Sequence, residues 1–130
     1  MTPEAEALLR KSRRSIEAGC LLLSKEFAED AASEAYYAMF YAAKAMLVSA
    51  GEKATQHKHV ARRFQQLFVA TGQIQGKYYD TLEEGLKLRH FADYETDLTY
   101  AVSSEDAAAS LEKATKFVAM AEELLRGSKP

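Results

Sequence analysis

The chain has 130 residues and a formal net charge of −2, with 48% hydrophobic and 28% charged residues. This composition is typical of one globular domain with a real core, and it argues against a disordered chain and against a uniformly basic nucleic-acid coat. The single cysteine, Cys20, excludes an internal disulfide, and no secretory signal is evident at the start of the chain, so we expect a cytoplasmic protein.

The first helix is predicted to begin with Thr2 as its N-cap and Pro3 at its first position, where the missing N–H costs nothing. No further proline follows until Pro130, so long helices are expected in between. Helical spacing predicts an inner face made of Leu9, Ile16, Cys20, Leu23 and Phe27. A thiol in such an apolar run is normally inert, so no chemistry is assigned to it.

The second helix is predicted from Asp30, as its cap, to Ala50, and residues 35–47 are apolar nearly all round. A helix of this kind lies in the middle of a bundle. The apolar stretch is shorter than the roughly 18–20 residues that a membrane span needs, so no membrane association is expected.

Three polar-tipped residues of this second helix, Tyr37, Tyr41 and Lys44, share one face. In one interpretation they are packed core tyrosines with a lysine whose ammonium group reaches solvent. In the other they form a wall that stacks bases and binds phosphate.

Three more helices complete the prediction. The third follows a loop at residues 52–56 and ends at Gly72, and the fourth runs from about Gly76 toward Ala92. Ser103 is expected to cap the last helix, whose inner face repeats at strict helical spacing: Ala107, Leu111, Ala114, Val118, Ala121 and Leu125.

No alternating apolar pattern of strand length occurs, so the predicted fold is all-α, an up-and-down bundle of about five helices. We expect a single domain over residues 1–130 with a flexible tail at residues 127–130. A homodimer is also expected, because a symmetric partner commonly covers an incompletely buried helix face.

Candidate chemistry is concentrated at the end of the fourth helix, where Arg89 and Asp93 continue a stripe that begins with Leu82 and Leu86. Either the two charges form an ion pair that fixes the helix end, or Asp93 holds a guanidinium in a cleft that accepts a phosphate. His57 is expected to cap the third helix or to contact an anion. No metal is expected, since a zinc site generally needs three or four ligands, and no cofactor is expected either.

Two segments resemble the HEPN domain family. Residues 35–47 are very similar to the second-helix signature of that family, and residues 89–94 look like the R-x-x-A-D-Y ending of one of its prokaryotic branches. The resemblance covers nearly the whole chain, because the third helix and the last helix also resemble that branch. The residues that carry it in the third helix are His57, Val60, Phe64 and Phe68.

The resemblance implies a dimeric helical bundle whose gene often stands beside that of a minimal nucleotidyltransferase in toxin–antitoxin pairs. Active members resemble metal-independent ribonucleases in which an arginine and a histidine are separated by four to six intervening residues. After Arg89 those positions hold Tyr94, Glu95 and Thr96, and none of these side chains replaces imidazole near neutral pH. The interpretation therefore leans away from an enzyme.

The preferred interpretation is a non-catalytic or weakly catalytic module that binds a nucleotide or RNA phosphate and has a minimal nucleotidyltransferase as its partner. Its expected binding residues are Arg89, Asp93, Tyr94, Lys44, Tyr37 and Tyr41. One alternative is an RNA endonuclease toxin in which Arg89 works with a substitute base, either His90 of the partner chain or His57. A second alternative is a structural dimerisation module whose buried polar groups fix helix register.

Overall fold

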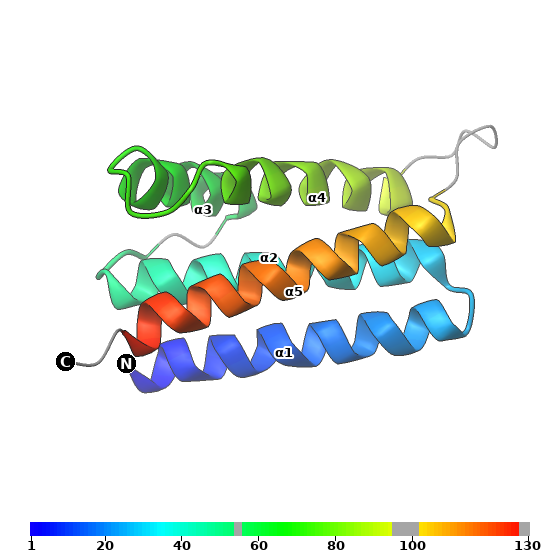
Figure 1. Cartoon of the computed structure of the whole chain (residues 1–130), viewed down its shortest axis with the longest axis horizontal. Helices are drawn as coiled ribbons and strands as arrows, with labels where there is room; N and C mark the ends of the chain where they lie inside the picture. Colours follow the sequence, from blue (N-terminus) through cyan, green and yellow to red (C-terminus); the bar gives the residue numbers. More distant parts are fainter. Residues whose placement is uncertain (54–55, 95–101, 128–130) are drawn as a thin grey trace.

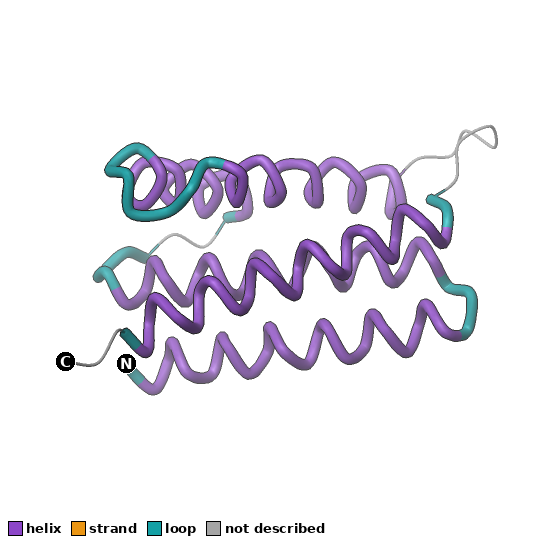
Figure 2. The backbone as a smooth tube through the Cα atoms, in the orientation of Figure 1, coloured by secondary structure: helices purple, strands orange, loops and turns teal. Residues whose placement is uncertain are grey.

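The fold is built from helices alone in the residues that the computed structural model describes, which are 1–53, 56–94 and 102–127, without the side chains of residues 57, 58 and 91–94. Figure 1 shows these helices in chain order, and Figure 2 distinguishes them from the described loops and turns. The predicted all-α bundle is therefore confirmed. Its elements are α1 (Pro3–Ser24), α2 (Ala28–Ser49), α3 (His57–Phe64), the π-helical segment η1 (Gln65–Val69), α4 (Lys77–Tyr94) and α5 (Ser104–Arg126).

Helix α2 is the centre of the bundle, as its apolar sequence predicts. It packs against α1, α3, α4 and α5, and in Figure 1 it lies between α1 and α4 while α5 crosses in front of it. Many of its buried residues are alanines, which let neighbouring helices approach closely. In Figure 1, α1 and α4 lie on opposite sides of α2.

The predicted cap of the second helix was wrong by three residues. The N-cap of α2 is Phe27, whose side chain makes no capping hydrogen bond, and Asp30 lies in the first turn. The reason is the tight connection before it, in which Glu26 adopts a left-handed conformation with φ 68°. An acidic side chain in the first turn still interacts favourably with the helix dipole.

The inner face of α1 differs from the predicted one. Cys20 is exposed, and Phe27, which follows α1, is 54% exposed. Ile16 and Leu23 are half-buried. The residues that α1 buries are mostly small: Ala5, Leu9, Ser12, Ser15 and Gly19.

The buried face of α1 is thus rotated about the helix axis relative to the predicted face. Close approach of α1 to its neighbours explains this rotation. The hydroxyl of Ser12 is fully buried and donates a hydrogen bond to the carbonyl oxygen of Ala38 in α2. At Gly19, an added Cβ would lie 2.6 Å from Leu111 Cδ2 of α5. Small side chains on this face permit contacts that larger apolar ones would block.

The predicted caps of the first and last helices are confirmed. Thr2 Oγ1 accepts a hydrogen bond from the Ala5 N–H at 3.1 Å, and Ser103 Oγ accepts one from the Asp106 N–H at 3.0 Å. The predicted inner face of α5 is buried, apart from Leu125, which is half-buried. No helix in the described ranges is long and apolar enough to span a membrane.

The third and fourth helices differ from prediction in detail. α3 ends at Phe64 and continues as η1, in which Phe68 is buried. α4 continues to Tyr94, two residues beyond the predicted end. Its inner face does contain Leu82, which is 2% exposed.

Candidate functional site

One strip of α2 remains partly exposed between the neighbouring helices, and it contains the three polar-tipped residues that the sequence singles out. Tyr37, Tyr41 and Lys44 are each half-buried. Their neighbours on α2 at positions 36, 38–40, 42, 43 and 45–47 are buried. Helical spacing therefore aligns these three side chains in one row, which we call the α2 strip.

Arg89 of α4 reaches the α2 strip from one side. Its guanidinium carbon, Cζ, lies 5.1 Å from the centre of the Tyr37 ring, and its Nε is buried. A guanidinium over a tyrosine ring is attracted by the ring quadrupole, by about 0.5–2 kcal/mol depending on how far the pair is desolvated. The contact holds a charged, planar group with five N–H donors at the edge of the strip.

Tyr36 lies beside this arginine and is buried at 1% exposure. Burial raises the pKa of its hydroxyl well above the usual range, the positive charge of Arg89 opposes that shift, and Tyr37 and Glu83 add to it. The hydroxyl therefore stays protonated near neutral pH. It can donate or accept a hydrogen bond beside the guanidinium, but it is not available as a general base.

Lys11 of α1 reaches the α2 strip from the other side, and sequence reasoning missed it. Its Nζ lies 4.9 Å from the centre of the Tyr41 ring. The rings of Tyr41 and Tyr37 stack, with centroids 6.0 Å apart and planes 27° apart. Lys11, Tyr41, Tyr37 and Arg89 thus follow one another across α1, α2 and α4, and we call them the cation–tyrosine row.

The only sequence signal for Lys11 was the charge run in which it stands, Arg10 to Arg14, and a run of this kind is usually a solvated face. Its position opposite Tyr41 depends on how α1 and α2 pack. No spacing within a single helix contains that information.

Several predicted residues lie outside the described side chains. Asp93 and Tyr94 belong to α4, and His57 occupies the first position of α3, but the side chains of all three are beyond the described set. The Arg89–Asp93 pair and the anion contact of His57 therefore stay predictions. His90 is exposed on α4.

Within the described ranges, no three His, Cys, Asp or Glu side chains lie close enough together to hold a metal ion.

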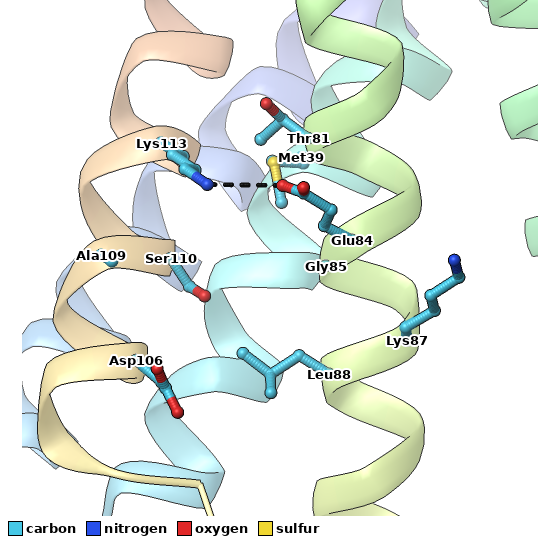
Figure 3. Close-up of a pocket in the computed structure, with 10 residues that line it drawn as sticks. All are labelled: Met39, Thr81, Glu84, Gly85, Lys87, Leu88, Asp106, Ala109, Ser110 and Lys113. Carbon is cyan, nitrogen blue, oxygen red and sulfur yellow. Dashed lines mark hydrogen bonds and ion pairs between the residues drawn. The ribbon is translucent and has the colours of Figure 1, made fainter.

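A groove between α4 and α5 is the other feature near α4, and Figure 3 shows the side chains that line it. Its volume is about 360 Å³. An ion pair crosses the groove, with Lys113 Nζ 3.3 Å from Glu84 Oε1. None of the predicted site residues lines this groove. Its lining residues are Met39, Thr81, Glu84, Gly85, Lys87, Leu88, Asp106, Ala109, Ser110 and Lys113.

Comparison with known proteins gives a family for most of the chain. The family model described as "HEPN domain" matches residues 5–124. A protein of Methanocaldococcus jannaschii named "Putative toxin MJ0142" is 32% identical over 115 residues, which are 88% of this chain and 77% of that protein. A protein of Gloeobacter violaceus named "UPF0332 protein glr0978" is 28% identical over 125 residues, which are 96% of this chain and 98% of that protein.

Proposed function

The chain belongs to the HEPN domain family, and from this premise we propose that it is a module that binds a nucleotide or RNA phosphate and acts in a toxin–antitoxin-type system. We further propose that it is non-catalytic or weakly catalytic and pairs, as a homodimer, with a minimal nucleotidyltransferase. The name of the Methanocaldococcus jannaschii relative favours the toxin side of such a pair.

The placement of Arg89 is the observation that supports this proposal most directly. The residue is half-buried, and its guanidinium lies over the Tyr37 ring at the partly exposed α2 strip. An arginine held by a ring keeps its orientation, so it loses less side-chain entropy when it forms a bidentate contact with a phosphate. Lys44, which belongs to α2, adds a second positive charge at the same strip.

The Tyr36 side chain beside Arg89 supports the proposal of weak or absent catalysis. Cleavage of RNA without a metal needs a general base for the ribose 2′-hydroxyl, and the Tyr36 hydroxyl is held in its neutral form. Among the described side chains, Tyr36 therefore offers no acceptor for that proton, and Arg89 would only stabilise charge on the phosphate.

The ribonuclease alternative is kept because relatives have toxin names and because His90 is exposed on α4 beside Arg89 in the sequence. In that case His90 of the partner chain would act as the base. Degradation of RNA by the purified protein in the presence of a chelator, lost in both Arg89→Met and His90→Ala, would establish it.

Binding to labelled single-stranded RNA and to a mononucleotide, measured by fluorescence anisotropy and calorimetry, tests the proposal. Arg89→Met keeps an unbranched side chain and removes the charge, and we expect it to weaken binding by about 10- to 100-fold, as for a lost charge-assisted hydrogen bond of 1.5–3 kcal/mol. Lys87→Met is the matched control, since Lys87 is an exposed cation on the same helix that lines the α4/α5 groove. Equal binding by wild type and a folded Arg89→Met variant would refute the proposal.

The proposed partner has its own test. Co-expression with the product of a neighbouring nucleotidyltransferase gene should yield a complex that survives size-exclusion chromatography. If the two proteins elute separately at micromolar concentration, the pairing is wrong even where phosphate binding holds.

A further inference from the structure

We propose that Lys11 is a second phosphate-binding residue and that the cation–tyrosine row matches a single-stranded oligonucleotide with at least two phosphate groups, rather than a mononucleotide. This inference rests on the proposed function of Arg89, and it adds a residue on a different helix and a minimum ligand length.

The row has one cation over each of its two rings. Arg89 Cζ lies 5.1 Å from the Tyr37 ring centre, the two ring centres are 6.0 Å apart, and Lys11 Nζ lies 4.9 Å from the Tyr41 ring centre. Laid end to end, these three contacts span about 16 Å, which is the upper limit of the separation.

The two cations belong to different neighbours of α2. α1 and α4 each pack against α2, and they lie on opposite sides of it in Figure 1. Packed helix axes are about 8–10 Å apart, so α1 and α4 stand roughly two such distances from each other. Lys11 and Arg89 therefore approach the α2 strip from opposite directions.

Two cations that stand near this limit are too far apart to share one phosphate. Charge-assisted hydrogen bonds to phosphate oxygens are about 2.7–2.9 Å long, so two cations that share one phosphate lie within roughly 8 Å of each other. A strand with two or more linked phosphates can contact both ends of the row. The two tyrosines then act as a spacer that fixes the distance between the charges.

The charges around Lys11 favour an anionic ligand. Lys11, Arg10 and Arg14 are exposed on α1, and none of them forms an ion pair with a described residue. Arg13, between them, is directed elsewhere, since its NH1 lies 2.6 Å from the Glu122 carboxylate of α5. Three cations of one helix thus remain beside the row without a described acidic partner.

Binding of uridine monophosphate, a dinucleotide and an oligouridylate of about eight nucleotides, each measured for the purified full chain, tests the inference. Lys11→Met should weaken octamer binding about five- to tenfold and lower the salt slope of log K by about 0.7, the value for one phosphate contact on a single strand. It should leave binding of the monophosphate unchanged. Lys11→Arg should restore octamer binding.

Lys25→Met is the matched control, because Lys25 is an exposed lysine directly after α1. Thermal unfolding of Lys11→Met, followed by circular dichroism, verifies that the fold of this variant is intact. If Lys11→Met and Lys25→Met bind the octamer equally while Arg89→Met does not, Lys11 is not a binding residue and the proposed function stands. If Lys11→Met weakens binding of the monophosphate as much as binding of the octamer, the length requirement is wrong. If the wild type binds none of the three ligands, the proposed function itself fails.

Discussion

Replacing Tyr41 by leucine removes the ring that joins Lys11 to the rest of the cation–tyrosine row. Tyr41 is half-buried, stacks on Tyr37 at 6.0 Å and lies under Lys11 Nζ at 4.9 Å. A stacked aromatic pair contributes about 0.5–1.5 kcal/mol beyond its buried area. An exposed cation–π contact contributes about 0.5–1 kcal/mol. Tyr41→Leu should therefore lower the free energy of unfolding by about 1–2.5 kcal/mol.

Urea unfolding followed by circular dichroism measures this loss, with all variants at one protein concentration so that any dimerisation affects them equally. Tyr41→Phe keeps both ring contacts and should stay within about 0.5 kcal/mol of the wild type. Lys11→Met, made in the wild type and in the Tyr41→Leu background, completes a double-mutant cycle with an expected coupling of about 0.5–1 kcal/mol.

A coupling of zero in that cycle would refute the reasoning, since it would mean that the ring and the ammonium group do not interact in solution. The same conclusion follows if Tyr41→Phe is as destabilising as Tyr41→Leu. In that case the hydroxyl, and not the ring, would be the part that matters.

Three further results are expected. Phe117→Ala should lower the free energy of unfolding by about 3–5 kcal/mol, because Phe117 is fully buried, and a smaller loss in urea unfolding would mean that the core collapses around the cavity. Gly19→Val should destabilise by about 1–3 kcal/mol, because its Cβ would lie 2.6 Å from Leu111 Cδ2, and an unchanged melting temperature would show that α1 and α5 are further apart than described. The hydrogen bond from Arg63 holds the pKa of the Glu52 carboxyl below its usual range, so this pair adds stability above pH about 4.3 that is lost as pH falls through the lower folded pKa. A ¹³C NMR titration should show that Arg63→Ala raises the Glu52 pKa, and no change would contradict the ion pair.

Local sequence rules predicted the elements of this fold well, and the reason is that each rule acts within one helix. Helical spacing placed the inner face of α5, and the Thr2 and Ser103 caps follow from hydroxyl groups that precede helices. The near-continuous apolar sequence of α2 predicted its central position. Arg89, Tyr37 and Tyr41 were also singled out from their sequence alone.

The same rules failed where two helices meet. In α1, large apolar side chains were expected inside, but Cys20 is exposed and Gly19 is buried against α5. Periodicity gives the spacing of a face but not the rotation of the helix about its axis. That rotation depends on how closely the small residues of α1 and α2 let the two backbones approach.

By itself, the sequence determined the helices, the caps of the first and last of them, the central place of α2 and the family resemblance, because these depend on neighbours a few residues apart. Only the tertiary structure decided that Arg89 lies over Tyr37 and Lys11 over Tyr41. These contacts join three helices, and their geometry is set by the packing of side chains that are far apart in the chain. The packing of α1 and α4 against α2 is what places the two cations over two neighbouring rings.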